Sequence, residues 1–125
     1  FLGDSVEGKN VVIIDDMISS GESMLEVAKQ LKARGARDVF VCTTFGLFTD
    51  GLSKFDEYYE KGYIARVITT DLSYRTPELL SRPWYEPAVM GKYLASIIDT
   101  LNHDVSVDKV RDTTYKLNKL LASHR

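Results

Sequence analysis

An apolar run followed by two acids and several small residues is the feature that most constrains the fold of this chain. Residues 11–14 are Val-Val-Ile-Ile, and such a β-branched run favours a parallel strand covered on both faces. Met24, Val27, Ala28 and Leu31 then recur at helical spacing. The chain is therefore predicted to be an α/β protein in which the intervening loop lies at the carboxyl end of a strand.

That loop has the composition of a phosphate-binding loop. It consists of Ser19, Ser20, Gly21, Glu22 and Ser23. The start of the predicted helix offers unpaired N–H groups and the positive end of a dipole to an anion, and small side chains let a phosphate approach the backbone. The serine hydroxyls add hydrogen-bonding groups. The alternative is that Ser20 or Ser23 only caps the helix.

Two adjacent carboxylates, Asp15 and Asp16, close the predicted strand. Successive side chains of a strand diverge, so the pair is suited to hold two neighbouring hydroxyls of one sugar. The alternative is that Asp16 merely helps to turn the chain. Together with the loop, the two acids predict a site for a ribose phosphate at the carboxyl edge of the sheet, where open α/β sheets bind ligands.

This order of residues resembles the signature of the phosphoribosyltransferase superfamily: an apolar strand, two acids, two apolar residues and a small-residue phosphate loop. Within it, residues 3 to about 107 resemble the ribose-phosphate pyrophosphokinase family. Further similar segments are Cys-Thr-Thr-Phe-Gly-Leu-Phe-Thr at 42–49 and Val-Ile-Thr-Thr at 67–70. The chain departs from the family in the loop, where an acid is lost, and at Phe45, where the family has His.

The resemblance implies a type I phosphoribosyltransferase-like half-domain, with a helix-covered parallel sheet, that is a fragment of a longer chain. Residues 1–107 would form the ribose-phosphate-binding domain, with 108–125 a helical extension packed on it. Asp15 and Asp16 would hold the ribose hydroxyls, and residues 19–23 the 5-phosphate of ribose 5-phosphate or phosphoribosyl pyrophosphate. No catalytic residue or metal ligand is assigned within these residues.

The full-length protein would then make phosphoribosyl pyrophosphate from MgATP and ribose 5-phosphate. Mg²⁺ would arrive with ATP, and the partners would be the chain's own N-terminal domain and further copies in a homo-oligomer. Two alternatives stay open: a nucleobase phosphoribosyltransferase, and a non-catalytic regulatory subunit that binds phosphoribosyl pyrophosphate. The isolated fragment is expected to be inactive.

Composition restricts the other classes of partner. A formal net charge of −2 with both signs interspersed provides no basic field for nucleic acid. No run approaches the roughly 18 apolar residues that span a bilayer. The single cysteine, Cys42, forms no disulfide framework, so a cytoplasmic location is expected. His103 and His124 are interpreted as solvated surface residues.

The remaining pattern predicts three strands, at 10–15, 39–44 and 64–70, and helices at 22–34, 52–61, from Pro87 onward and at 106–122. The last helix is expected to bury Val110, Leu117 and Leu121. Thr43, Thr44, Thr69 and Thr70 end two strands and are candidates to line the ligand crevice. Tyr58, Tyr59 and Tyr63 are expected to pack, and Trp84 to staple the following helix.

Overall fold

The computed structural model describes residues 3–124, without the side chains of residues 109 and 111. The chain divides into two compact units, one up to Val89 and one from Met90. We describe each by itself. This division by compactness is not the predicted functional boundary after residue 107, which stays a prediction.

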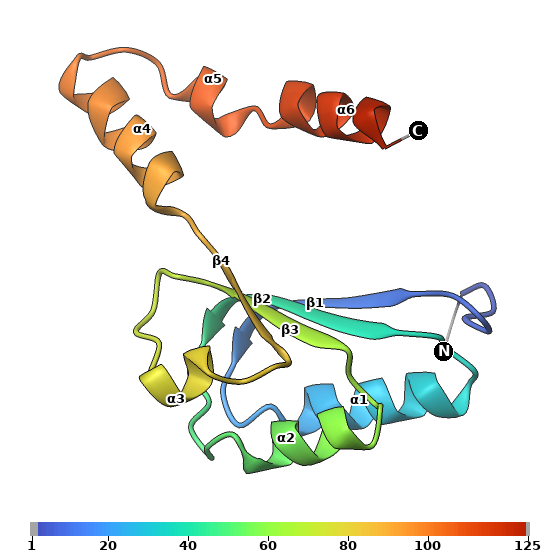
Figure 1. The fold of residues 1–125 in the computed structure, drawn as a ribbon. Helices are drawn as coiled ribbons and strands as arrows, with labels where there is room; N and C mark the ends of the chain where they lie inside the picture. The colour runs from blue at the N-terminus through green and yellow to red at the C-terminus, as the bar shows by residue number, and fades with distance from the viewer. Residues whose placement is uncertain (1–2, 125) are drawn as a thin grey trace. The chain divides into compact units, whose positions relative to one another are not determined.

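The first unit contains a parallel four-stranded sheet with the strand order β1-β2-β3-β4 (Figure 1). The strands are β1 (Val11–Ile18), β2 (Val39–Gly46), β3 (Arg66–Thr70) and β4 (Tyr85–Ala88), and the helices between them are α1 (Glu22–Ala33), α2 (Ser53–Glu60) and α3 (Pro77–Leu80). Each strand pairs in parallel with the next strand along the chain. The predicted α/β class with a parallel sheet is confirmed.

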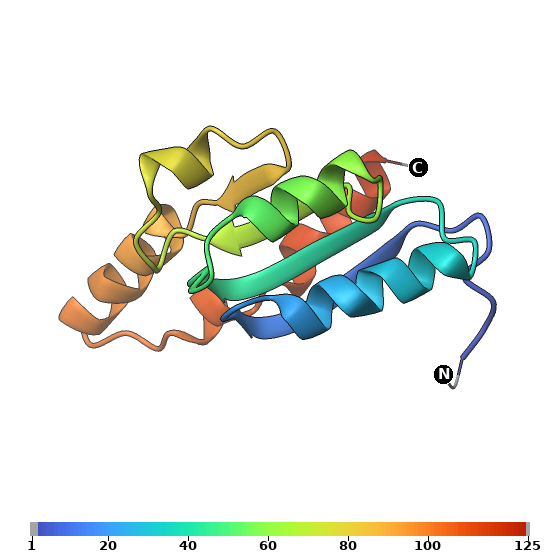
Figure 2. The same cartoon turned by 90° about the horizontal axis from the view of Figure 1, so that it is seen from below.

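Helices α1 and α2 lie side by side on one face of this sheet (Figures 1 and 2). Their apolar residues, including Leu25, Ala28 and Phe55, form the core with Val41 and Val67 of the sheet. Fully burying a Leu, Val or Phe side chain contributes about 1.5–3 kcal/mol. The core therefore fixes the two helices, and with them the loops at the carboxyl edge.

The opposite face of β1 is exposed, which corrects the expectation that this strand is covered on both faces. The side chains of Val12 and Ile14 are 52% and 80% exposed. A β-branched run has the same appearance in sequence whether one face or both are buried, because the pattern of residue types does not record where the helices pack. Over residues 11–14, half-buried and exposed side chains therefore alternate although all four residues are apolar.

Strand β4 replaces the predicted helix start at Pro87. Proline has no N–H to donate, so it suits both the first turn of a helix and an edge strand. Here Pro87 aligns with Thr69 of β3 at the edge of the sheet. The short helix α3, absent from the predicted elements, begins where the Thr76 hydroxyl accepts a hydrogen bond from the Leu79 N–H at 3.1 Å.

The second unit consists of α4 (Gly91–Asn102), α5 (Asp108–Arg111) and α6 (Thr114–Ser123). The single helix expected over 106–122 is interrupted at Asp112, which is extended and accepts a hydrogen bond from the Thr114 N–H. The expected burial is also wrong, since Leu117 and Leu121 are 54% and 60% exposed and Val110 is half-buried. Over the described residues, no helix is long and apolar enough to cross a membrane.

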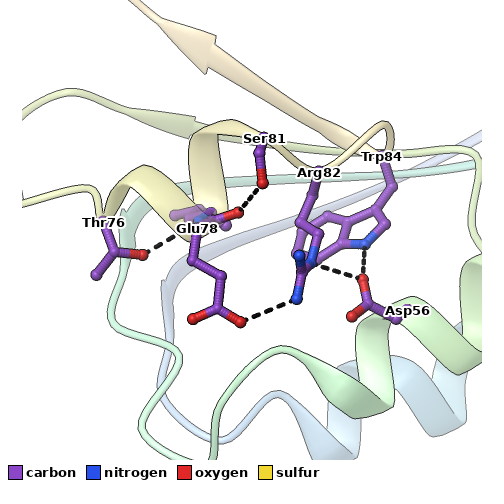
Figure 3. Close-up of polar contacts among 7 residues, drawn as sticks. Asp56, Thr76, Glu78, Ser81, Arg82 and Trp84 are labelled. Atoms are coloured by element: carbon purple, nitrogen blue, oxygen red, sulfur yellow. Dashed lines mark hydrogen bonds and ion pairs between the residues drawn. The ribbon is translucent and has the colours of Figure 1, made fainter.

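A buried tryptophan links α2 to the segment before β4 (Figure 3). Trp84 is fully buried, and its indole N–H donates to Asp56 Oδ1 at 2.7 Å. The same carboxylate lies 3.0 Å from the Arg82 guanidinium, which also pairs with Glu78 at 2.9 Å. Trp84 is thus a core residue of the first unit, and the interpretation as a staple for the following helix is wrong.

We predict that Asp56→Ala lowers the free energy of unfolding by about 1–3 kcal/mol, because it leaves a buried indole N–H without its acceptor. Glu78→Ala is the matched control, since it removes the exposed partner of the same arginine and should cost no more than about 0.5 kcal/mol. Urea denaturation of both variants measures the difference. Equal losses would show that the buried hydrogen bond is not the important contact.

Candidate functional site

The two predicted ligand-binding acids lie within β1 rather than at its end. The strand runs on to Ile18 because Met17 and Ile18 pair with Phe45 and Gly46 of β2. Asp15 and Asp16 are both exposed, and the Asp15 carboxylate accepts a hydrogen bond from the Asp16 N–H at 2.8 Å. Both carboxylates are accessible to a ligand, at the part of the strand nearest the loop.

The loop after β1 enters α1 through Gly21 in the left-handed conformation, at φ 82°. A Cβ atom at this position would overlap the Phe55 ring, coming within 2.8 Å of its Cε2 atom and closer still to Cζ. Glycine is therefore required at position 21 for two reasons: the positive backbone angle φ and the close approach of a buried ring. The residue brings the loop backbone down onto the core.

The start of α1 has no side-chain cap. The Ser20 hydroxyl accepts only a long hydrogen bond, 3.4 Å, from the Glu22 N–H, one residue short of the positions that an N-cap normally serves. This arrangement does not support helix capping as the reason for the serines. The first-turn N–H groups are of the kind that bind anions when no side chain occupies them.

The loop after β2 lies against the loop after β1. The Leu47 N–H donates to the Ile18 carbonyl at 2.8 Å, and the Thr49 N–H donates to the Ser19 carbonyl at 3.0 Å. Between them Phe48 is buried with a positive φ of 50°, a conformation that costs a non-glycine residue of order 1–3 kcal/mol. The two loops thus form one backbone layer at the carboxyl edge.

A cavity of about 180 Å³ opens beside this layer, lined by the loop after β2 and by residues of the segment 74–79. None of the predicted site residues lines it. Glu22 of the predicted loop lines a different cavity, of about 400 Å³, together with Lys54 and residues of α1 and α2. The cavity beside the loop after β2 is therefore a separate feature of the same edge.

Two of the four strand-end threonines are buried instead of lining a crevice. Thr43 is 7% and Thr69 1% exposed, and the Thr69 hydroxyl shares a 2.7 Å hydrogen bond with the Tyr85 hydroxyl. Thr70 is half-buried and donates to the Thr44 carbonyl at 2.6 Å. Of the four, only Thr44 is exposed. The hydroxyls of Thr69 and Thr70 join neighbouring strands, whereas that of Thr43 donates to the Phe45 carbonyl of its own strand.

Lys54, at the start of α2, donates a hydrogen bond from its ammonium to Glu22 Oε1 in the phosphate loop. This hydrogen bond and the positive charge of Lys54 lower the pKa of Glu22, and the same bond raises the pKa of Lys54. Lys54 was not identified as a site residue from the sequence, because residue spacing predicts contacts within one helix but not contacts between two separate helices. The only signal was a basic residue in the first turn of the next helix.

The tyrosines and histidines match their predicted roles. Tyr58 and Tyr59 pack against the core, and Tyr58 makes an edge contact with Tyr63 at 5.3 Å between ring centroids. His103 and His124 are exposed.

Comparison with known proteins places the chain in a family. Residues 1–77 match the model of the phosphoribosyl synthetase-associated domain. The ribose-phosphate pyrophosphokinase of Vibrio cholerae is 30% identical over 85% of this chain and 32% of its own length, and that of Shewanella oneidensis is 32% identical over the same shares. The ribose-phosphate pyrophosphokinase of Pyrococcus abyssi is 36% identical over 54% of this chain and 24% of its own length.

A crystal structure of phosphoribosylpyrophosphate synthetase from Mycobacterium smegmatis has the same fold. Its TM-score is 0.70 with 24% sequence identity, over 82% of this chain and 33% of that one. The fold and the matched segments define a phosphoribosyl synthetase-associated α/β domain. The chain belongs to the ribose-phosphate pyrophosphokinase family and spans about a quarter to a third of the length of the relatives it matches.

We predict that Gly21→Ala destabilises the first unit by about 2–4 kcal/mol, from left-handed strain together with overpacking against Phe55. Gly62→Ala is the control, since Gly62 has a similar φ of 74° but open space around a Cβ atom. It should cost only about 1–2 kcal/mol, from strain alone. Chemical denaturation compares them, and losses of the same size would mean that the contact with Phe55 is unimportant.

Proposed function

We propose that this chain is the part of a ribose-phosphate pyrophosphokinase that binds ribose 5-phosphate. The observation that supports this most is the uncapped start of α1, with left-handed Gly21, a few residues after two exposed acids in β1. An anion site and two diol-binding groups within a few residues suit a ribose phosphate. Family membership supports the same ligand.

In the proposed complex, Asp15 and Asp16 accept hydrogen bonds from the 2- and 3-hydroxyls, directly or through water. The backbone N–H groups of residues 21–23 and the hydroxyls of Ser19, Ser20 and Ser23 hold the 5-phosphate. The sugar is then fixed at both ends, which orients its anomeric hydroxyl for attack on ATP. Holding reactants in a productive geometry supplies about 7–11 kcal/mol in favourable cases.

Mg²⁺ is proposed as the cofactor of the full-length protein. Among the described residues, no group of three or more His, Cys, Asp or Glu side chains could hold a metal ion by itself. Magnesium commonly keeps several waters and binds substrate phosphates, so it would arrive with ATP, and Asp15 or Asp16 would meet it through one of those waters. When bound, the ion neutralises charge on the transferring phosphates.

We infer that the ATP-binding groups and the remaining partners lie in other parts of the full-length protein. The relatives are about three to four times longer than the segment matched here. β1 forms one edge of the sheet, and its exposed Val12 and Ile14 add an apolar face. We propose the protein's own N-terminal domain as the partner at this strand, within a cytoplasmic homo-oligomer.

A non-catalytic subunit that binds phosphoribosyl pyrophosphate is the second candidate. The half-exposed Phe45 favours it, because this side chain follows Thr44 at the carboxyl end of β2 and has no proton to transfer. Such a subunit would bind the ribose phosphate through the same loop. Both candidate functions predict binding of a ribose phosphate, so only an assay of turnover distinguishes the enzyme from the non-catalytic subunit.

We predict that Asp15→Asn and Asp16→Asn, made singly in the full-length protein, each weaken ribose 5-phosphate binding by about 1.5–3 kcal/mol. Both side chains are exposed, so the melting temperature should stay within about 2 °C of the parent. Calorimetric titration, an assay of phosphoribosyl pyrophosphate formation and thermal melting measure the three effects. Unchanged affinity with lowered stability would make the acids structural.

The isolated residues 1–125 are predicted to form no phosphoribosyl pyrophosphate from MgATP and ribose 5-phosphate, and to associate through the exposed strand and face of β1. Light scattering and a turnover assay test the two parts. A charged substitution, Ile14→Lys, should reduce association, whereas the same change at exposed Leu120 of α6 should not. Turnover by the isolated chain would show that ATP-binding groups lie within it.

A further inference from the structure

The proposed phosphate site is acidic. Asp15 and Asp16 precede the loop, Glu22 lies within it, and Asp50 follows the residue whose N–H bonds to the Ser19 carbonyl. A phosphate monoester carries about −1.5 to −2 charges at neutral pH. The helix start attracts this charge, but the Glu22 carboxylate, in the first turn of the same helix, repels it.

Lys54 offsets the carboxylate that lies nearest the proposed phosphate. Its ammonium is hydrogen-bonded to Glu22 Oε1, so the ion pair connects the first turn of α1 to the first turn of α2. Lys54 also interacts with the charge of Asp50 on the neighbouring loop. Both side chains of the pair are at least half exposed, so the pair is not required by burial.

We propose that Lys54 is a positioning residue for the 5-phosphate, which acts by neutralising and holding Glu22 at the start of α1. This inference rests on the proposed function and adds to it a residue from outside the loop. Without Lys54, the free carboxylate would compete with the phosphate for the same N–H groups and raise the negative charge of the site. Lys54 therefore favours a dianionic ligand without touching it.

The same helix provides an internal control. Lys61 forms an exposed ion pair with Glu57, four residues away in the chain. This pair resembles the first in exposure and chemistry, yet both of its members lie in the second half of α2 and its cap, and neither belongs to the loop. A general effect of removing a surface lysine should be equal at Lys54 and Lys61.

The experiment measures the dissociation constant of ribose 5-phosphate by calorimetry for the full-length protein at low salt. Lys54→Ala should weaken binding about five-fold, and Lys54→Arg should restore it to within about two-fold of the parent. Lys61→Ala should stay within about two-fold of the parent. Glu22→Gln serves only as the reference background of a double-mutant cycle with Lys54→Ala. In the Glu22→Gln background, Lys54→Ala should have little further effect, because no carboxylate remains to be neutralised.

High salt should shrink the effect of Lys54→Ala, since exposed charges are screened. An equal loss in the two backgrounds would overturn the proposal and indicate that Lys54 contacts the phosphate itself. An unchanged affinity of Lys54→Ala would overturn it as well. If the parent itself fails to bind ribose 5-phosphate, the proposed function fails first, and circular dichroism of each variant excludes misfolding as the cause of a loss.

Discussion

The packing of one aromatic ring, that of Phe55, determines how the carboxyl edge of this domain is built. The side chain is fully buried, stacks on Trp84 with 5.4 Å between ring centroids, and meets Phe48 edge-on at 5.1 Å. Its outer atoms occupy the space that a side chain at position 21 would need. Three loops from different parts of the chain therefore share one support.

This shared support explains why the proposed site needs few direct contacts of its own. The loop after β1 rests on Phe55 through Gly21, the loop after β2 through Phe48, and the segment before β4 through Trp84. Backbone groups held by a packed core keep their directions without a ligand, and preorganised groups lose little freedom on binding. The core thus contributes to recognition although it touches no ligand.

Local patterns predicted the first five elements of the first unit, from β1 to β3. The helix at α1 ends as expected, where Gly35 adopts a positive φ of 86° after the last turn. The strand at β4 was missed because Pro87 fits an edge strand and a helix start equally well in sequence. The break at Asp112 was missed because the apolar spacing of the last segment continues across it.

The candidate site was predictable only in part. Residues 15–23 are contiguous, so their order along the chain was enough to suggest a loop beside two acids. The ion pair of Glu22 with Lys54 could not be predicted from the sequence, since it depends on how two helices lie on the sheet. The burial of Thr43 and Thr69 likewise depends on which face the helices cover.

The order of the sheet also bears on how the domain is made. Every strand pairs with its successor along the chain, and each pair is joined through a helix on the same face. A ribosome that releases the chain from its N-terminus would therefore deliver each strand to a partner that is already present. When strands are added to the sheet in chain order, residues that contact each other lie at moderate distances along the sequence. Such contacts favour folding during synthesis.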